Sequence, residues 1–300
     1  MKTFFVSFLF LISFNLNSYD RITGLEFASR SEVIANNGMA ATSHPLATQT
    51  AISILKSGGN AIDAAIAANA VLGLVEPTGC GIGGDLFAIV WIEKDKKLYG
   101  LNSSGPAPKN ISIEKIKDLG LDKIPPYGPI PISVPGAVEG WSALHKKFGK
   151  FEFAKLFDDA INYAENGFPV SELIAYYLNR SSEIFKDYKN FQKVWMPNGV
   201  TPKKGDIFKN PLLAQNYRDI ASSYGEAFYR GKIADDIVKS INNEGGFYSP
   251  SDLSNFKSEW IEPVSSNYRG YDIWELPPNG QGIAALQILN ILENYDLSSL

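Results

Sequence analysis

The feature that most constrains the fold is a run of small and apolar residues at 38–85, which holds two helical patterns and ends in a glycine-rich loop. The first pattern has Ser43 as its expected N-cap and Pro45 in its first turn, and it stops at a Gly-Gly pair. The second spans 61–75, with Asn60 as its expected N-cap, and is apolar on nearly every side. A helix without a polar face is buried, so we expect the second helix inside a core.

Strand patterns follow the glycine-rich loop. The segment 87–93, FAIVWIE, is a continuous apolar run typical of a strand buried on both faces, and 98–102 follows after a charged turn. We therefore expect these two strands to form a hairpin. A second hairpin is predicted from 262–268 and 271–276, and a last helix, apolar on most faces, from 283 to about 292.

Composition excludes several kinds of site. The single cysteine, Cys80, cannot form an intrachain disulfide, and two histidines, His44 and His145, are too few for a His/Cys zinc site. The net charge is −4, with both signs mixed along the chain, which leaves no basic footprint for nucleic acid. We expect no metal, no cofactor and no nucleic-acid partner.

The N-terminus resembles an export signal. Lys2 precedes an apolar run at 4–14, which is long enough for a signal peptide but shorter than the roughly 20 residues of a membrane-spanning helix. We predict a signal peptide at 1–18 and a periplasmic or secreted protein without a stable membrane span. An uncleaved anchor or a mistaken start codon is the alternative.

Three short patterns suggest other chemistries but lack the required context. Gly79-x-Gly81-x-x-Gly84 matches a dinucleotide fingerprint by letters, yet a helix precedes it and a strand follows, the reverse of what that motif needs. Ser-x-x-Lys occurs three times without the companion motifs of a penicillin-recognising enzyme. A Ser-His-Asp triad would need His44 or His145, and both are expected at helix caps or on the surface.

Eight segments in order resemble the γ-glutamyltranspeptidase family, over roughly residues 37–300. They are GMAATSHPLA, ILKSGGNAIDAAIA, GIGGDLFAIVW, LNSSGPAP, ISVPGAVEGW, GEAFYRGKIA, GGFYSPSDL and YRGYDIWELPPNGQGIAALQILNILENYD. The pattern is most similar to the oxamate-amidohydrolase-like branch. The resemblance implies an α/β fold, the αββα sandwich of N-terminal-nucleophile hydrolases. Residues 19–300 would be a large-subunit segment of it, with core strands within 87–102 and an outer helical region at 136–255.

The resemblance also implies a precursor that cuts itself into a large and a small subunit. The nucleophilic threonine begins the small subunit and uses its own α-amine as general base, within a Thr-Thr-His-like sequence. None of the seven threonines here is followed by Thr-His. We therefore predict no catalytic residue in this chain, a nucleophile C-terminal to Leu300, and a small subunit as partner. The chain would then be truncated at its C-terminus, and alone it would have no turnover.

The resemblance places a substrate wall at Asn102, Ser103, Ser104 and Gly105. Typical γ-glutamyl enzymes carry an arginine here that binds the α-carboxylate, and Ser104 stands in its place. A serine donates one hydrogen bond but cannot form arginine's bidentate pair with a carboxylate. The expected substrate is a small molecule with a γ-glutamyl or related amide bond, as in glutathione. An amidase acting on oxamate-like or other acyl amides, and a catalytically inactive binding protein, are the alternatives.

Overall fold

The computed structural model describes residues 32–297. The chain divides into two units, 1–39 and 40–300. In the first unit the described residues, 32–39, form no helix or strand, and the signal peptide predicted at 1–18 lies outside the described residues. Everything that follows concerns the second unit.

Two antiparallel helices, α1 (Pro45–Lys56) and α2 (Ala61–Val75), match the predicted pair. Asn60 caps α2 as expected: its side chain accepts the backbone N–H of Asp63, whose carboxylate accepts the N–H of Asn60 at 2.9 Å. Most residues of α2 are buried, which confirms the interpretation of its apolar pattern. The predicted cap at Ser43 was wrong, because Nδ1 of His44 accepts the N–H of Leu46 at 3.2 Å.

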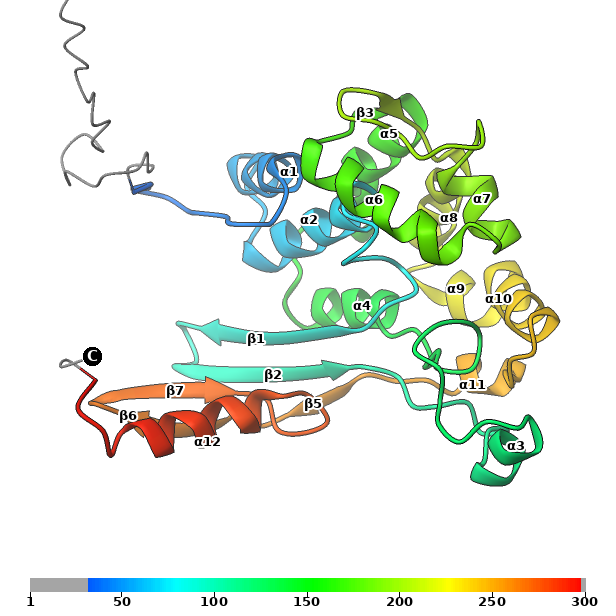
Figure 1. Ribbon diagram of the computed structural model, residues 1–300. Coiled ribbons are helices and arrows are strands. Elements are labelled where there is room, and N and C mark those ends of the chain that lie inside the picture. The colour runs from blue at the N-terminus through cyan, green and yellow to red at the C-terminus, as the bar shows by residue number, and fades with distance from the viewer. Residues whose placement is uncertain (1–31, 298–300) are drawn as a thin grey trace, which may run out of the picture. The chain divides into compact units, whose positions relative to one another are not determined.

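The central sheet has three antiparallel strands in the order β1 (Leu86–Ile92), β2 (Lys97–Ser103) and β5 (Glu259–Ile261). The β1–β2 hairpin confirms the prediction. Strand β5, which pairs with the second half of β2, was not predicted from the sequence. Helix α4 (Ala137–Phe148) covers one face of the hairpin (Figure 1).

The other face of β1 is uncovered in the part of the chain that the structure describes. Its side chains alternate, so that Leu86, Ala88 and Val90 pack against the core while Phe87, Ile89 and Trp91 point away from it. These three are 45%, 41% and 51% exposed. The prediction of a strand buried on both faces was therefore wrong for the described residues, which bury only one.

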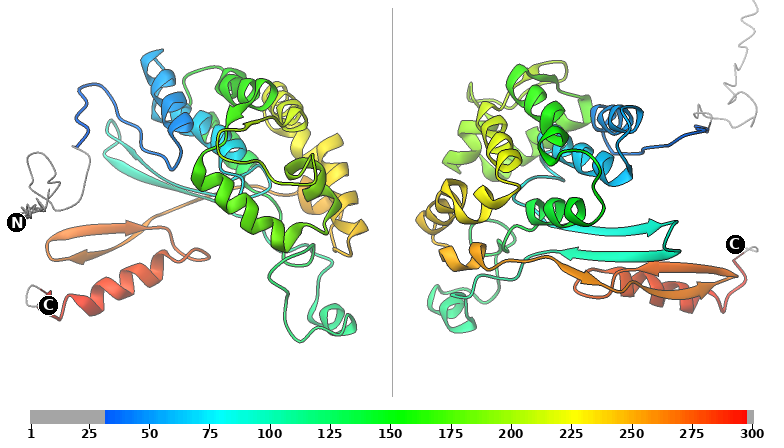
Figure 2. Two further views of the ribbon diagram at one scale, coloured as in Figure 1. Left: turned by 45° about the horizontal axis from the view of Figure 1, so that its top comes forward. Right: turned by 180° about the vertical axis from the view of Figure 1, so that it is seen from behind.

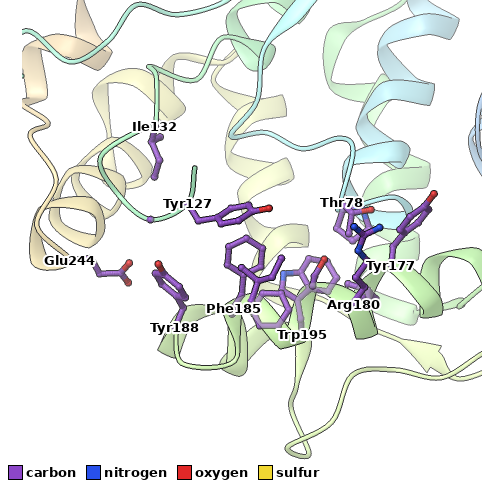
Figure 3. Close-up of a pocket in the computed structure, with 15 residues that line it drawn as sticks. Thr78, Tyr127, Ile132, Tyr177, Arg180, Phe185, Tyr188, Trp195 and Glu244 are labelled. Carbon is purple, nitrogen blue, oxygen red and sulfur yellow. The ribbon is translucent and has the colours of Figure 1, made fainter. Parts of the chain in front are cut away.

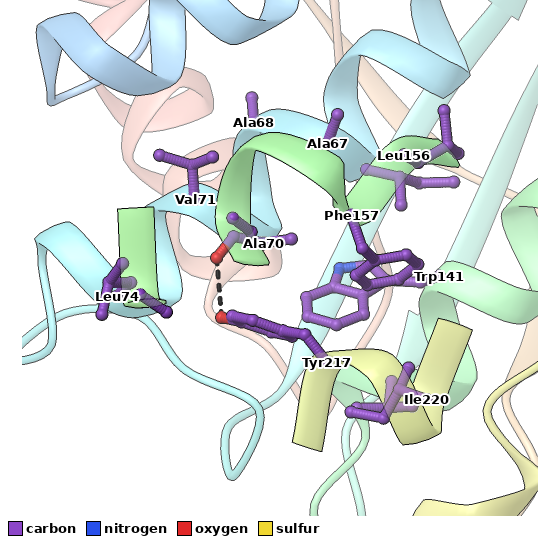
Figure 4. Close-up of a cluster of buried hydrophobic side chains, with 14 of the residues drawn as sticks. Ala67, Ala68, Ala70, Val71, Leu74, Trp141, Leu156, Phe157, Tyr217 and Ile220 are labelled. Carbon is purple, nitrogen blue, oxygen red and sulfur yellow. Dashed lines mark hydrogen bonds between the residues drawn. The ribbon is translucent and has the colours of Figure 1, made fainter. Parts of the chain in front are cut away.

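The outer region is mostly helical, as expected, and its first elements pack against α2. Helix α3 (Ile113–Asp118) precedes α4 and lies apart from this region (Figure 1). The elements of the outer region after α4 are η1 (Phe153–Phe157), α5 (Asp158–Asn166), β3 (Phe168–Pro169), α6 (Glu172–Phe185), α7 (Lys189–Trp195), β4 (Ile207–Phe208), α8 (Pro211–Ser222), α9 (Glu226–Arg230), α10 (Lys232–Asn243) and α11 (Pro250–Ser254). The core between them holds the indole of Trp141 edge-on to Phe157, with ring centroids 5.6 Å apart. Beside them, buried Tyr217 donates its hydroxyl hydrogen bond to the carbonyl of Ala70 at 2.7 Å (Figure 4).

The last elements are a hairpin of β6 (Val264–Tyr268) and β7 (Tyr271–Glu275), followed by α12 (Gly282–Leu292). The hairpin turns at Arg269 and Gly270, both with positive φ, as the sequence predicted. Helix α12 lies against the hairpin (Figure 2) and buries only Leu286. The apolar side chains of α12 are therefore largely exposed among the described residues.

Candidate functional site

A cavity of about 560 Å³ lies where β2 ends. The end of β2 and the turn after it form one wall, α11 and the turn after it form another, and Asn279, from the loop between β7 and α12, closes the rim. Three of the four residues that the sequence placed at a substrate wall line this cavity: Asn102, Ser104 and Gly105.

Ser103 does not line the cavity. Successive side chains in a strand point to opposite faces, so Ser103 is turned away from its neighbours and is fully buried. Its hydroxyl donates to the carbonyl of Gly136 at 2.7 Å and lies 2.6 Å from the hydroxyl of Ser258. In this position Ser103 joins β2 to the start of α4.

A closed polar triangle joins Asn102, Ser104 and Asn279 at the mouth of the cavity. The amide of Asn102 donates to Oδ1 of Asn279 at 2.9 Å, and the amide of Asn279 donates to Oγ of Ser104 at 2.9 Å. The N–H of Ser104 donates in turn to Oδ1 of Asn102 at 3.0 Å. Asn279 was not predicted as a site residue, because nothing in its local sequence connects it to β2.

Charged side chains of both signs line the same cavity. Lys109 and Lys257 supply positive charge, and Asp252 and Glu259 supply negative charge. Burial alone would raise the pKa of Asp252, but hydrogen bonds from the N–H of Lys109 and from Ser249 outweigh it and hold this pKa below its usual value. Asp252 is therefore ionised at neutral pH and fixes the backbone at Lys109.

Close backbone contacts fix the wall of the cavity. A Cβ at Gly105 would lie 1.7 Å from the carbonyl oxygen of Val134, and one at Gly136 would lie 1.8 Å from that of Ser103. The N–H of Val134 donates to the carbonyl of Pro106 at 2.9 Å. Only glycine allows these two chain segments to approach so closely.

The glycine-rich loop joins the same assembly. The carbonyl of Gly84 accepts the N–H groups of Gly136 and Ala137, both at 2.9 Å, at the start of α4. A strand, β1, follows this loop. The arrangement confirms that the glycines form a turn at a core strand rather than a dinucleotide-binding loop, which would open a helix.

A partly buried pair of hydrogen-bonded side chains, Glu139 and Ser258, lies between β2 and α4. The N–H of Ser258 donates to Oε2 of Glu139 at 2.9 Å, and the Ser258 hydroxyl donates to the same oxygen. Burial raises the pKa of Glu139 above its usual value. The carboxylate thus holds Ser258 against Ser103.

The remaining titratable candidates have structural roles. His44 caps α1, and His145 lies between the hydroxyl of Tyr224 at 2.6 Å and the carbonyl of Phe151 at 2.7 Å. Burial raises the pKa of the Cys80 thiol, which is half-buried. Within residues 32–297 there is no group of three His, Cys, Asp or Glu placed to hold a metal, and no helix long and apolar enough to cross a membrane.

Comparisons with known proteins agree on one family. The family model described as gamma-glutamyltranspeptidase matches residues 47–300. The chain is 37% identical over 269 residues to the glutathione hydrolase-like YwrD proenzyme of Bacillus subtilis, covering 89% of this chain and 51% of that protein. It is 32% identical to the glutathione hydrolase proenzyme of Escherichia coli, covering 88% of this chain and 46% of that protein. The chain thus spans about half the length of these curated relatives.

Solved structures confirm the fold class. A cephalosporin acylase from Bacillus halodurans superposes with a TM-score of 0.86 at 43% identity, covering 93% of this chain and 53% of that one. The gamma-glutamyltranspeptidase of Helicobacter pylori superposes with a TM-score of 0.85 at 33% identity, covering 90% and 78%. The described residues therefore have the α/β fold of an N-terminal-nucleophile hydrolase, in its large-subunit part.

Proposed function

Because this chain belongs to the gamma-glutamyltranspeptidase family, we propose that it is the large-subunit part of an autoprocessing amidohydrolase. The observation that carries the proposal is the uncovered face of β1 beside the cavity. Phe87 pairs with Asn102 in the β1–β2 register, so the exposed ring of Phe87 and the polar mouth of the cavity share one face of the sheet. A small subunit that covered this face would bring its own groups against Asn102.

The proposed chemistry needs one nucleophile from that small subunit. Its N-terminal threonine hydroxyl attacks the amide carbonyl carbon while its α-amine takes the hydroxyl proton. The C–N bond breaks, the amine leaves with that proton, and an ester acyl-enzyme remains. Water then hydrolyses the ester, or an acceptor amine takes the acyl group. Backbone N–H groups of the small subunit would stabilise the oxyanion.

On this proposal the large subunit recognises the acyl group. Asn102, Ser104 and Asn279 offer neutral donors and acceptors at the mouth of the cavity, in place of an arginine. Lys109 and Lys257 are the cations among the lining residues. They would supply long-range attraction for a carboxylate without the bidentate geometry of arginine. The substrates would include γ-glutamyl amides such as glutathione, bound through these groups.

One observation favours a second candidate, an amidase acting on oxamate-like or other acyl amides. The amide of Asn279 lies within hydrogen-bond distance of the Ser104 hydroxyl through its oxygen, at 3.2 Å, and its nitrogen, at 2.9 Å, so the wall at this position is neutral and does not require a substrate carboxylate. The similarity to a cephalosporin acylase structure at 43% identity supports this class as well. The two candidates differ only in which acyl group the wall selects.

We also propose that the protein is exported. Lys2 and the apolar run at 4–14 support a signal peptide. Edman sequencing of the protein purified from a culture fraction would test this. A mature chain that starts near residue 19 in the periplasm or medium is expected, and an intact N-terminus in the cytoplasm would contradict it.

Expression of the whole reading frame tests the proposed enzyme. Self-cleavage should yield two fragments, the second beginning with threonine, and the processed protein should hydrolyse γ-glutamyl-4-nitroanilide, oxamate or a cephalosporin side-chain amide. The 300-residue chain alone is the control and should hydrolyse none of them. Turnover by this chain alone would contradict the proposal, and so would an unprocessed, inactive product. The latter would support a binding protein instead.

A further inference from the structure

A second cavity, of about 640 Å³, lies between α6, α7 and the loop that crosses from α3 to α4 (Figure 3). Its volume falls within the range of about 300–1,000 Å³ that is usual for small-molecule sites. No residue lines both this cavity and the one at the end of β2. It is therefore a separate candidate site, outside the proposed catalytic region.

The middle of this cavity is lined by aromatic rings. Tyr127 meets Phe185 edge to face, with ring centroids 5.2 Å apart, and Phe185 lies 5.7 Å from Phe191. Trp195 stacks on buried Phe208 at 5.0 Å and 12°, which fixes the plane of the indole. The rings thus have defined positions before any ligand arrives.

These rings remain accessible. Helix α7 contributes Phe191 and Trp195 to the cavity, yet none of its residues is fully buried. Tyr127, on the opposite wall, is also exposed. Aromatic surface of this kind, concentrated in a concavity, is typical of a binding site rather than of a core.

The two ends of the cavity carry opposite charges. Figure 3 shows Arg180 near Thr78 at one end and Glu244 near Tyr188 at the other, with the aromatic rings between them. Within residues 32–297 neither charged side chain has an ion-pair partner. The guanidinium of Arg180 can bind a carboxylate through two parallel hydrogen bonds, and the carboxylate of Glu244 can accept hydrogen bonds from an ammonium group.

We propose that this cavity binds a short peptide with free termini and an aromatic side chain. The peptide carboxylate pairs with Arg180, its α-amine pairs with Glu244, and its side chain packs among Tyr127, Phe185 and Trp195. A single amino acid carries both charges on one carbon, whereas a peptide separates them along its backbone. The proposal does not depend on catalysis by the other cavity.

Calorimetric titration of the 300-residue chain with the tripeptide Ala-Phe-Ala tests the proposal, together with the N-acetylated and C-amidated forms of the peptide. The free peptide should bind about tenfold more tightly than either blocked form, because each block removes one charge-assisted pair. Arg180→Gln should weaken binding of the free peptide by a similar factor but leave the C-amide unaffected. Glu244→Gln should show the same selectivity toward the N-acetyl form.

Matched controls lie on the two helices that line the cavity. Lys193→Gln on α7 and Glu183→Gln on α6 change exposed charges that do not line the cavity, and should leave binding unchanged. Circular dichroism would establish that all four variants fold. The absence of saturable binding to the wild-type chain would overturn the proposal. Equal affinity for free and blocked peptides, or no effect of the Arg180 and Glu244 variants, would overturn it too.

Discussion

Replacing Gly105 with alanine tests whether close backbone contact builds the wall of the candidate catalytic cavity. The new Cβ would lie 1.7 Å from the carbonyl oxygen of Val134, whereas real contacts of this kind are essentially never under 3.0 Å. The two segments must therefore separate by more than 1 Å. Both are backbone, so no side-chain rotation can relieve the overlap.

The size of the effect follows from what such a separation breaks. The hydrogen bond from the N–H of Val134 to the carbonyl of Pro106 is 2.9 Å long and cannot survive a shift of that size. Val134 is fully buried, so losing this partner costs about 1–3 kcal/mol. Overpacking of the neighbouring chain adds about 1–3 kcal/mol. We expect the free energy of unfolding to fall by about 3 kcal/mol, with a drop of about 5–10 °C in Tm.

Urea and thermal unfolding, followed by circular dichroism, would measure this loss. Gly83→Ala is the matched control, since a Cβ there meets nothing within 4 Å. It should leave the free energy of unfolding unchanged or raise it by up to about 1 kcal/mol. If the free energy of unfolding of Gly105→Ala lies within about 0.5 kcal/mol of the wild-type value, the substitution behaves like one at an exposed surface position. The close backbone approach would then not stabilise this wall.

Three further predictions concern the layers behind the cavity. Asn60→Ala should lower the free energy of unfolding by about 2 kcal/mol in urea titrations, because it removes the cap of α2 and the hydrogen bond to the carbonyl of Phe148. A loss below about 0.5 kcal/mol, the low end for N-cap substitutions, would refute this. Tyr217→Phe should lower the free energy of unfolding by about 1–2 kcal/mol in the same assay, because it removes the buried hydrogen bond to the carbonyl of Ala70 (Figure 4). An unchanged free energy of unfolding would show that this hydrogen bond does not stabilise the fold. The raised pKa of Glu139 means that its charged form destabilises the fold at neutral pH, a penalty that fades as the pH falls through the folded-state pKa. From pH 7 to about pH 4 the wild type should therefore gain stability relative to Glu139→Gln, and a constant difference would refute the assignment.

Local signals predicted the helices and hairpins well. The capping box of Asn60 and Asp63 fixes the start of α2, and the apolar pattern after it predicts the rest of the helix. The positive φ at Gly270 fits the turn that the sequence predicted. At α1 the cap fell on His44 rather than Ser43, because an imidazole nitrogen can accept a hydrogen bond as a serine hydroxyl does. Strand β5 was missed because its three residues become a strand only through pairing with β2.

The candidate site was only partly predictable. The motif 102–105 was recognised by its resemblance to a family, but strand alternation turns Ser103 into the core while Asn102 and Ser104 face the cavity. Asn279 bonds Ser104 across 175 positions of sequence, and no periodic pattern encodes such a contact. Whether Asn102, Ser104 and Gly105 contact a substrate stays a prediction.

The mismatch in β1 connects the sequence to the proposed function. Its uninterrupted apolar letters are typical of a strand covered on both faces, yet Phe87, Ile89 and Trp91 remain about half exposed in the described residues. Covering the exposed half of Trp91 alone would contribute about 2–3 kcal/mol at roughly 25 cal/mol per Å². The apolar side chains that require this cover lie on the same face as Asn102. A layer of protein packed on this face would therefore also cover the cavity. The proposed small subunit must pack there to place its nucleophile near Asn102.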